Sequence, residues 1–593
     1  MSKLQSNLRL FCHRNEAAIW LALLVLLAAV LRIKGLTFQS YWYDELFSAH
    51  LSNPSHTFSE IVELSLADVH PPFYQLAMWA SYKTFGYTEW AGRFPSMLAG
   101  ILAIPAIFLL GRELFSKRVG LYAAALAASN YYFVYFSQEA RSYTFLVLFC
   151  CLSFFYFMRA LRHESWLDVA LYVLVTVLLL YTHYFGFVLM SAQGVVFLVY
   201  IGLGHGRDRG VLTRAAIAAG VTIAAILPLV PAIINHSEIG EFWITQPQFI
   251  AAVNYFLAYF SSVWLAGILA MLLLLALTLG MYRINCGQDK SWVRFSIVAL
   301  LLWIVMGFSL PWLRGLVGQP VITNRNTIML IPPILLLAAY GLNSLPVLLL
   351  QRLTGAAILV LSVVYLVAGI DFYGRVTKNQ YREMAHSLTM HKPVLPVYTL
   401  NFNDTKYNVY FEQLGSELNA VDASLLEEKL NAGNAEPVFW IADGHRLAFQ
   451  TDLEERFGLH QVALYRHRNT AAELLVNPVR ARPIEMEPAM ISTADGNWHS
   501  AGMVLLSSDT DQILVALNEM ARVDPGRKVQ IDLQDVAGRV LETHTANLGA
   551  MPSTLQINPQ VSAGDQVRLL VRLPAGEPEP GVWLIPGPGS AEH

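Results

Sequence analysis

Two adjacent carboxylates, Asp44 and Glu45, follow the first long apolar run of the chain, directly after the aromatic residues Tyr41-Trp42-Tyr43. Titratable groups at the boundary between bilayer and water are seldom there by accident. Partial burial raises the basicity of a carboxylate, which can then accept the proton of an alcohol. Asp44 is therefore a candidate general base and Glu45 a supporting acid. The alternative is a pair of solvated loop acids beside the aromatic residues that membrane interfaces carry anyway.

A second acid and a histidine close the same polar segment, in Asp68-Val69-His70-Pro71-Pro72. The two prolines stiffen the chain and hold His70 at a predicted helix start, where amide donors and the helix dipole favour an anion. His70 can thus bind a phosphate, with Asp68 orienting the imidazole or sharing in acid–base work. A simple turn before a helix explains the same residues equally well.

Three arginines, Arg93, Arg141 and Arg325, stand where predicted spans meet the same side of the membrane. Guanidinium groups in such places can bind a phosphate. Single arginines at helix ends more often reach to the interface, and Arg141 has a local partner in Glu139, which is itself counted among the predicted donor-binding residues. Among the three, Arg325 ranks first as a phosphate ligand.

A fourth polar cluster, Tyr181-Thr182-His183-Tyr184-Phe185, falls at a predicted turn on that side. A histidine among aromatic residues can hydrogen-bond a sugar or a phosphate, and Tyr184 beside it carries a hydroxyl. A lone histidine is more often a structural partner of the backbone, so both interpretations of His183 stay open.

The elements that must position these clusters are membrane helices. The chain has 593 residues, of which 55% are hydrophobic and 14% charged, and its mean hydropathy is +0.45. These values are far more apolar than those of a soluble chain. The net charge of -3 gives no reason to expect a nucleic acid partner. The four cysteines show neither a disulfide framework nor the spacing of a zinc site.

Apolar runs of the length that crosses a bilayer, about 17 to 25 residues, predict about eleven transmembrane helices. They cover residues 16–36, 94–115, 119–137, 142–161, 166–183, 184–203, 211–234, 262–282, 294–313, 327–345 and 353–373. Basic residues follow every even-numbered span, which places those loops and the N-terminus in the cytoplasm. The polar clusters and everything after Tyr373 then face the other side. Arg32, Lys34 and Arg314 are exceptions to this charge trend.

The first outer loop has a helical pattern of its own. Thr57 and Glu60 fit a capping box, and apolar residues recur at helical spacing over residues 58–66, which predicts a helix lying in the interface. A second short helix is expected over residues 73–85. Residues 249–260 have a similar pattern and are expected to lie flat or to re-enter the membrane.

After residue 373 charged residues become common and apolar runs shrink to strand length. Predicted helices (380–391, 406–414, 447–457) alternate with predicted strands (394–400, 437–442, 461–465). This alternation predicts a small α/β domain. From about residue 478, short strands such as 503–506, 512–516, 528–533 and 566–571 predict a C-terminal β-sandwich. The expected domains are a transmembrane domain (1–375), an α/β domain (376–477) and a β-sandwich with a loose Pro/Gly-rich tail (478–593).

Together these motifs resemble the GT-C type membrane glycosyltransferases, specifically the protein O-mannosyltransferase-like superfamily that includes the lipid A aminoarabinose transferases. The resemblance covers about residues 15–375, and the combination is specific where each motif alone is not. It rests on Asp44-Glu45, Asp68 to Pro72, Arg93-Phe94-Pro95-Ser96, Gln138 to Arg141, Tyr181 to Phe185 and the Arg325 segment, the last three of which look like the large bacterial branch.

The resemblance implies a transferase of the bacterial inner membrane. It would move one hexose or pentose from a polyprenyl-phosphate carrier, at the outer face of the lipid bilayer, to an acceptor hydroxyl on a glycan, a lipid or a protein. In such families the first-loop Asp is the presumed catalytic residue, which maps onto Asp44. The position of His70 carries a basic phosphate-binding residue in some relatives.

The mechanism expected from this resemblance is an inverting displacement. Asp44 accepts the proton of the acceptor hydroxyl, and the departing lipid phosphate is stabilised by His70, by Arg325 and by Arg141 or Arg93. The energy for transfer lies in the sugar–phosphate bond, so no nucleotide is needed, and the sequence has no Gly-rich phosphate loop with a Lys. No cofactor is required by this chemistry. A divalent cation at the Asp44–Glu45 pair stays open.

Two other classes compete with this interpretation, namely a transporter or flippase for a lipid-linked sugar and a non-catalytic envelope scaffold. A transporter predicts polar residues near the midpoints of spans and two similar halves. Here the polar clusters gather at one predicted face, and the two halves of the membrane domain do not match.

Overall fold

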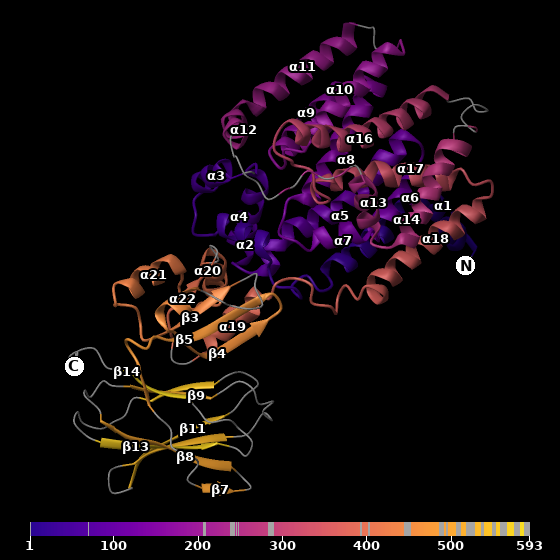
Figure 1. The fold of residues 1–593 in the computed structure, drawn as a ribbon. Coiled ribbons are helices and arrows are strands. Elements are labelled where there is room, and N and C mark those ends of the chain that lie inside the picture. Colours follow the sequence, from indigo (N-terminus) through magenta and orange to yellow (C-terminus); the bar gives the residue numbers. More distant parts are fainter. Residues whose placement is uncertain are drawn as a thin grey trace. The chain divides into compact units, whose positions relative to one another are not determined.

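The computed structural model divides the chain into two compact units (Figure 1). The helical unit comprises Met1–Phe38 and Leu51–Arg375, and the second unit comprises Gln39–His50 and Val376–His593. The structure describes residues 2–68, 70–204, 209–237, 244, 246, 248, 250–280, 282, 290–391, 394–400, 404–443, 452–484, 491–493, 496–505, 512–517, 528–534, 539–547, 553–557, 566–573 and 581–585. The short segment Gln39–His50 is thus grouped with residues more than three hundred positions later in the chain.

Seven helices within the described residues are long and apolar enough to cross a membrane. They are Asn15–Ile33 in α1 (Ser2–Ile33), α5 (Glu89–Leu114), α8 (Tyr143–His163), Arg209–Ile234 beginning with α11 (Arg209–Ile226), Ser291–Val317 in α16 (Lys290–Val317), Asn326–Asn343 ending with α17 (Ile331–Asn343), and Leu348–Gly369 beginning with α18 (Leu348–Val364). The chain is therefore a multi-span helical membrane protein, as its composition predicts.

The predicted number of eleven spans is not confirmed. The bent pair α13 (Ala251–Phe260) and α14 (Val263–Leu275) adds an eighth span if the two helices, inclined by 107°, count as one. Two further apolar helices, α9 (Trp166–Leu180) and α10 (Gly186–Gly202), are shorter than the seven. The helix α12 (Val230–Ser237) follows α11.

The predicted span 119–137 is not one continuous helix, because two helices occupy it: α6 (Lys117–Ala128) and α7 (Tyr131–Ser137). Asn130 divides them. Its side-chain oxygen accepts a hydrogen bond from the Phe133 amide at 3.0 Å, and its amide group donates to the Tyr259 carbonyl at 3.0 Å. An N-cap of this kind starts a new helix, and one polar residue is easily lost in a hydropathy average.

The loop after the first span contains the two predicted helices, α3 (Phe58–Ala67) and α4 (Phe73–Phe85), as well as α2 (Tyr43–Leu51), which the sequence pattern did not predict. The capping box of α3 is confirmed, since the Thr57 side chain accepts from the Glu60 amide and Glu60 Oε2 accepts from the Thr57 amide at 2.6 Å. Gly86 ends α4 with φ of 89°, a conformation that glycine adopts without strain. The predicted helix at 249–260 is α13.

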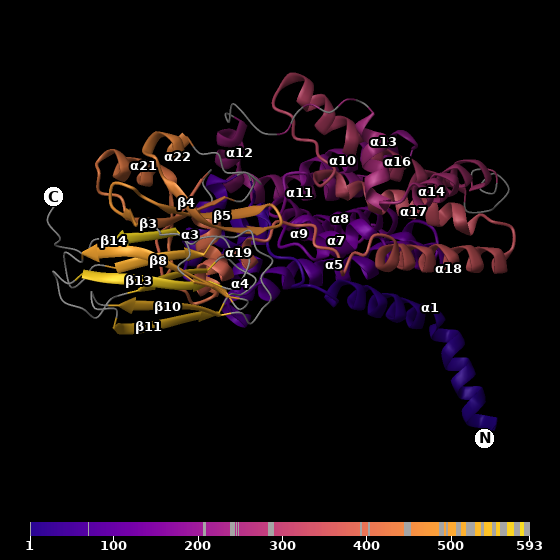
Figure 2. The ribbon, with the colours of Figure 1, turned by 60° about the horizontal axis from the view of Figure 1, so that its bottom comes forward.

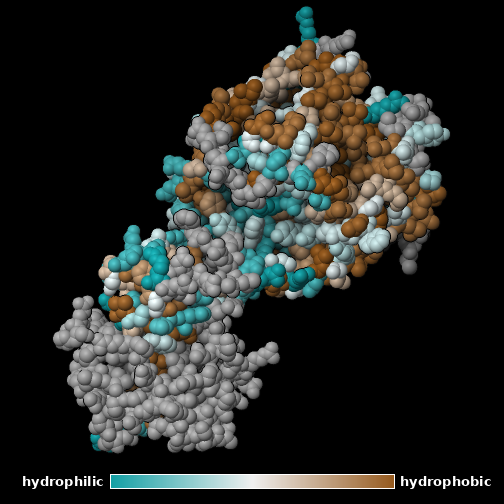
Figure 3. All heavy atoms as spheres, viewed as in Figure 1, coloured by the Kyte–Doolittle hydropathy of each residue, from teal (hydrophilic) through white to brown (hydrophobic). Residues whose placement is uncertain are grey.

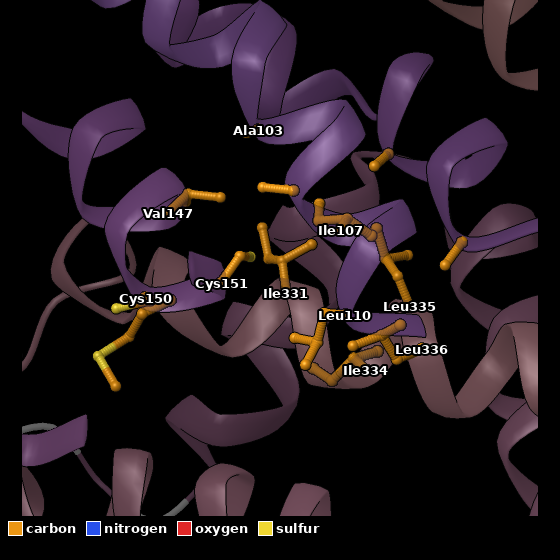
Figure 4. Packing of buried hydrophobic residues seen from close by; sticks show 14 of the residues in the cluster. Ala103, Ile107, Leu110, Val147, Cys150, Cys151, Ile331, Ile334, Leu335 and Leu336 are labelled. Carbon is orange, nitrogen blue, oxygen red and sulfur yellow. The ribbon is translucent and has the colours of Figure 1, made fainter. Parts of the chain in front are cut away.

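The core of the helical unit lies between α5, α8 and α17. Figure 4 shows buried side chains from these helices packed together: Ala103, Ile107 and Leu110 from α5, Val147, Cys150 and Cys151 from α8, and Ile331, Ile334, Leu335 and Leu336 from α17. Gly120 brings α6 close to α5, because a Cβ atom there would lie 2.5 Å from the Phe108 carbonyl oxygen. Small residues let membrane helices approach in this way.

The outer surface of the helical unit is largely apolar, as the brown areas of Figure 3 show. Large aliphatic side chains on several helices are more than half exposed, among them Leu26, Leu174, Leu198, Ile223 and Leu349. An apolar surface of this extent suits contact with lipid rather than with water.

The second unit contains a five-stranded mixed sheet in the order β2-β1-β3-β5-β4. Its strands are β1 (Val397–Thr399), β2 (Ala420–Asp422), β3 (Val438–Asp443), β4 (His460–His467) and β5 (Thr470–Val476), and its helices are α19 (Tyr381–Met390), α20 (Asp404–Gln413), α21 (Ala423–Asn431) and α22 (Asp452–Phe457). The strand β1 is parallel to β2 and β3, whereas β5 is antiparallel to β3 and β4. The sequence pattern missed β2, α21 and β5. Part of the predicted helix 447–457 lies outside the described residues.

The C-terminal residues form two antiparallel sheets, which agree with the predicted β-sandwich. One has the order β11-β10-β13-β8-β7 and the other β12-β9-β14-β6, and Figure 2 shows β8, β13, β10 and β11 side by side. The strands are β6 (Arg482–Ile484), β7 (Ile491–Thr493), β8 (Gly496–Leu505), β9 (Gln512–Leu517), β10 (Lys528–Gln534), β11 (Val540–Asn547), β12 (Ser553–Ile557), β13 (Gln566–Leu573) and β14 (Gly581–Ile585).

The expected loose tail contains one of these strands. The apolar run of β14 pairs with both β9 and β6, so this part of the tail belongs to a sheet. The rest of the predicted tail lies outside the described residues.

Candidate active site

The predicted site residues belong to both units. Asp44 and Glu45 lie in the second unit. The helical unit holds Asp68, His70, Arg93, Glu139, Arg141, His183, Tyr184 and Arg325.

His70 lies between the carboxylate of Asp68 and the guanidinium of Arg141 in the helical unit. Its Nδ1 is 2.7 Å from Asp68 Oδ2, and its Nε2 is 2.9 Å from Arg141 Nη2. A guanidinium can only donate, so Nε2 accepts the hydrogen bond from Arg141 while Nδ1–H donates to Asp68. The geometry thus selects the neutral Nδ1–H tautomer of His70 and joins three predicted residues from two sequence-distant motifs.

The ends of several helices hold this cluster. Asp68 is the C-cap of α3, where its amide donates to the carbonyls of Leu64 and Ser65. The start of α4 is attached to the 181–185 turn, because the Phe73 amide donates to the Tyr181 carbonyl at 2.9 Å. Ser96 of α5 donates to the Arg141 carbonyl at 2.9 Å, so the backbone that carries Arg141 is fixed to α5.

His183 and Tyr184 are brought to the same cluster. His183 is 7% exposed, and its Nδ1 accepts from the Phe185 amide at 3.1 Å. Burial, together with the nearby His70 and Arg141, lowers the pKa of His183 to about 3. Burial and the negative charge of Asp68 raise the pKa of Tyr184 to about 12. Both residues are therefore neutral near pH 7. The bond to Phe185 gives His183 a structural role in its turn and leaves Nε2 as its N–H.

Glu139 and Arg325 are near a second residue of the helical unit, Tyr132 of α7. Both residues interact electrostatically with Tyr132, and Glu139 itself is 1% exposed. Arg325 is the N-cap of the short 3-10 helix η3 (Asn326–Leu330). The ring of Tyr259 connects this helix to the Asn130 cap, because its hydroxyl donates to Thr327 at 2.7 Å.

Arg93 is almost fully buried, with 1% of its surface exposed, and its Nη1 donates to the Leu36 carbonyl at 2.8 Å. This carbonyl follows the end of α1. A guanidinium that satisfies backbone oxygens beyond a helix end has a structural function. The geometry thus connects Arg93 to the end of the first span.

Arg32 and Gln138 hold the loop before Arg141, and the sequence motifs did not reveal either role. The buried Arg32 donates to Ser137 Oγ at 3.1 Å and to the Ala128 carbonyl at 3.0 Å. In return, Gln138 Nε2 donates to the carbonyls of Arg32 at 3.0 Å and Lys34 at 2.7 Å. One sequence signal did exist, because Arg32 is a basic residue at a helix end predicted to be outside, against the charge trend.

Asp44 and Glu45 lie in the first turn of α2, where the helix dipole favours negative charge, but their surroundings differ. Glu45 is fully buried, and its Oε2 accepts from Lys378 Nζ at 2.9 Å and from the Trp42 amide at 3.3 Å. Asp44 is half-buried, and its carbonyl accepts from Ser48 Oγ at 3.1 Å. Glu45 is therefore a structural acid, and Asp44 is the more accessible member of the pair.

Residues 40–43 are fixed to the rest of the second unit by three further contacts. The Tyr41 amide donates to the Tyr410 hydroxyl at 2.6 Å, Ser40 Oγ donates to the Asn379 carbonyl at 2.7 Å, and Lys406 Nζ lies 3.9 Å from the centroid of the Tyr43 ring. Burial lowers the pKa of Lys406 to about 8. No sequence motif indicated these partners.

The Asp44–Glu45 pair does not suit the divalent cation considered from the sequence. A metal ion there would share the Glu45 carboxylate with the buried Lys378 ammonium, which is 2.9 Å away and repels it. Among the residues that the structure describes, no group of three or more His, Cys, Asp or Glu is arranged to hold a metal ion.

Comparison with known proteins bears on the origin of this architecture. A family model described as dolichyl-phosphate-mannose-protein mannosyltransferase matches residues 69–235. This segment contains His70, Arg141 and His183 but neither Asp44 nor Arg325. No curated protein matches the chain in sequence.

Two solved structures of ArnT from Cupriavidus metallidurans are similar to this chain. The apo structure has a TM-score of 0.55 at 14% sequence identity, over 79% of this chain and 99% of ArnT. The structure bound to undecaprenyl phosphate has a TM-score of 0.53 at 14% identity, over 78% of this chain and 97% of ArnT. The resemblance predicted from the motifs is thus confirmed at the level of architecture, and the chain has the fold of the GT-C membrane glycosyltransferases.

Proposed function

We propose that the protein is an inverting glycosyltransferase that moves a single sugar from a polyprenyl-phosphate carrier to an acceptor hydroxyl at the outer face of a bacterial inner membrane. The observation that carries the proposal is the Asp68–His70–Arg141 cluster of the helical unit. Its guanidinium is held in one orientation by His70 and can bind a phosphate. The GT-C fold, shared with an ArnT that binds undecaprenyl phosphate, supports the same chemistry.

Asp44 is the general base in this proposal. It accepts the proton of the acceptor hydroxyl while that oxygen attacks the anomeric carbon and the bond from this carbon to the phosphate oxygen breaks. The electron pair of that bond leaves with the phosphate, and the configuration at the anomeric carbon inverts. The contrast between the two acids supports the choice, because the Glu45 carboxylate is buried against Lys378 whereas Asp44 is half-buried.

Arg141 replaces Arg325 as the leading phosphate ligand. The Nε2 atom of His70 accepts a hydrogen bond from Arg141, so His70 orients the guanidinium, with Asp68 fixing the imidazole on its other side. Guanidinium groups match phosphate oxygens in geometry and charge. Arg325 acts as a second cation in this proposal. Both Arg325 and Glu139 interact electrostatically with Tyr132.

The neutral His183 and Tyr184 contact the donor in this proposal, through hydrogen bonds to its sugar or phosphate. Arg93 has the structural role that its bond to Leu36 indicates. The N-terminus is cytoplasmic, the domains after residue 375 are outside, and the acceptor is a hydroxyl of a glycan, a lipid or a protein.

The test is sugar transfer from polyprenyl-phosphate donors by the purified full-length protein and by Asp44→Asn. Wild type should release polyprenyl phosphate and join the sugar to the acceptor, and Asp44→Asn should not. Asp422→Asn is a matched control, because Asp422 caps α21 in the same unit through the Ser424 amide, a bond that asparagine can also make. Full activity of Asp44→Asn would refute the assignment of the base.

The same assay separates the competing classes. A flippase would move the lipid-linked sugar across vesicles and leave its sugar–phosphate bond intact. A scaffold would do neither. Release of polyprenyl phosphate in proportion to transferred sugar is the result that only the transferase predicts.

A further inference from the structure

The segment that carries Asp44 folds as a part of the C-terminal unit. Residues 39–50 belong to the compact unit that continues at Val376. Gln39 Oε1 accepts from the Thr377 amide at 3.0 Å, and Ser40 donates to the Asn379 carbonyl. Residues 39–40 thus lie beside residues 377–379, although both segments are joined in sequence to the helical unit.

The strongest contact between these segments is the ion pair of Glu45 and Lys378. Their side chains are 0% and 7% exposed, and the atoms Oε2 and Nζ are 2.9 Å apart. Glu45 Oε2 also accepts from the Trp42 amide, at the residue before α2 begins. The carboxylate of the residue next to Asp44 therefore connects the start of α2 to a lysine 333 positions later.

A buried ion pair of this kind is intolerant of losing one member. Removal of the lysine leaves a buried carboxylate without its counter-ion, which is strongly unfavourable, whereas removal of both charges is often tolerated. A bare Glu45 would have to turn toward water, and the adjacent Asp44 would turn with it. Its negative charge would also act directly on the neighbouring carboxyl group.

From this geometry we propose that Lys378 is a positioning residue for Asp44, so that the α/β domain holds the catalytic base in place. The inference rests on the proposed function, in which Asp44 is the base. Lys378 acts through Glu45 and the first turn of α2 and does not contact the substrate.

The charged groups around this segment come from several elements. Lys378 precedes α19, Lys406 of α20 lies over the Tyr43 ring, and Asp404 at the start of α20 acts electrostatically on Lys406. Among these groups, Lys378 is bonded to the acid beside Asp44. Its removal should therefore leave an unpaired negative charge beside Asp44 and move the acid limb of the kcat/KM profile to higher pH.

The experiment measures kcat, donor KM, pH profile and Tm of the full-length protein for Lys378→Met, Lys378→Arg and the double variant Glu45→Gln with Lys378→Met. A misplacement of about 1 Å costs on the order of a hundredfold in rate, which is the fall in kcat expected for Lys378→Met, with donor KM changed by less than about twofold. Lys378→Arg should recover most of the loss. The double variant should also have a higher kcat than Lys378→Met, because it leaves no unpaired buried charge.

Lys429→Met is the matched control. Lys429 forms an ion pair with Glu436 in the same unit, with the two side chains 31% and 30% exposed, and also donates to the Tyr398 hydroxyl. Its loss should lower Tm without a change in kcat per folded molecule or in the acid limb. If Lys378→Met behaves as Lys429→Met does, the positioning role is refuted.

Two results separate this inference from the proposed function. If Asp44→Asn is inactive while Lys378→Met keeps wild-type kcat and pH profile, the inference alone fails. If Asp44→Asn is fully active, the assignment of the base fails and the inference falls with it. Should Lys378→Met not fold, a double variant that folds but transfers sugar a hundredfold more slowly would overturn the charge argument.

Discussion

The polar cluster of the helical unit and the acidic segment of the second unit hold their charges in different ways. In the helical unit, Arg141 is oriented by a neutral imidazole that adds no charge of its own. In the second unit, the Glu45 carboxylate meets the Lys378 ammonium in a fully buried pair. The first arrangement suits a charge that must act on a ligand, and the second suits one that fixes the backbone.

This difference distinguishes residues that react from residues that support them. Asp44 and Glu45 are neighbours with the same functional group, and the sequence alone cannot rank them. Their surroundings can, because the acid that already has a buried counter-ion is the poorer base. Likewise, Arg93 bonds a backbone carbonyl and Arg141 an imidazole, although both were predicted at the same side of the membrane.

The largest effect should come from removing the two acids one at a time. Loss of a general base costs about 10² to 10⁴ in rate, so Asp44→Asn should abolish measurable sugar transfer. Glu45→Gln leaves the buried Lys378 ammonium without its counter-ion. It keeps the side-chain shape, and glutamine can still accept from Lys378 and the Trp42 amide, so activity should fall by roughly tenfold, far less than in Asp44→Asn. Initial rates at saturating donor give the ratio, and equal losses in both variants would erase the distinction between them.

The next effect concerns the two arginines. Arg141→Gln should lower kcat/KM for the donor by about 10² to 10³, since a preorganised donor to the leaving phosphate is lost. Arg159→Gln is the control, because Arg159 bonds Asp168 on the following helix. It should affect thermal stability and leave donor kinetics alone. Isotherms for binding of polyprenyl phosphate provide a second reading, and unchanged affinity in Arg141→Gln would contradict its assignment.

Acid should destabilise the cluster through His183. Its pKa is about 3 in the folded protein against 6.5 for the free side chain, so the unfolded state binds more protons between these values. Stability is then complete above pH 6.5 and falls as pH drops toward 3. The loss should reach about 3 kcal/mol at pH 4. Thermal unfolding of His183→Asn between pH 4 and 7 should show a shallower decline, and an identical slope in both proteins would speak against the buried neutral state.

Alkali should have the smallest effect, and it acts on the second unit. The pKa of Lys406 is about 8 in the folded protein against 10.5 for the free side chain, so the folded state carries the cost of a buried charge below pH 8. That cost disappears as pH rises toward 10.5, which stabilises the protein by about 2 kcal/mol. Lys406→Met should remove this rise from the Tm profile. A rise that persists in the variant would mean that another group titrates.

Local sequence patterns predicted much of the fold, because the physics behind them is local. The capping box at Thr57 and Glu60 and the helix over residues 73–85 are confirmed. The division of residues 119–137 was missed, because a hydropathy average hides the N-cap of Asn130. The second bond of Asn130 goes to a carbonyl on α13, a partner that no window of sequence contains.

The sequence could predict that Asp68, His70 and Arg141 lie close together, but not which residues hold the candidate site residues in place. The rule that polar clusters share one face grouped Asp68, His70 and Arg141, and the structure joins them. Lys378 was unrecognisable, because an ordinary lysine in a polar stretch becomes informative only beside its buried partner. Which residues bind donor and acceptor is a matter for the variants above.

The buried guanidinium of Arg32 has a consequence for biosynthesis. Its partners Ala128 and Ser137 lie about a hundred residues further along the chain, with sequence separations of 96 and 105, so they do not exist when α1 first emerges from the ribosome. Until α6 and α7 arrive, the arginine must stay at the water boundary, since an unsatisfied cation within lipid is costly. Membrane insertion of the first span is thus completed only once the loop that carries Arg141 has been made.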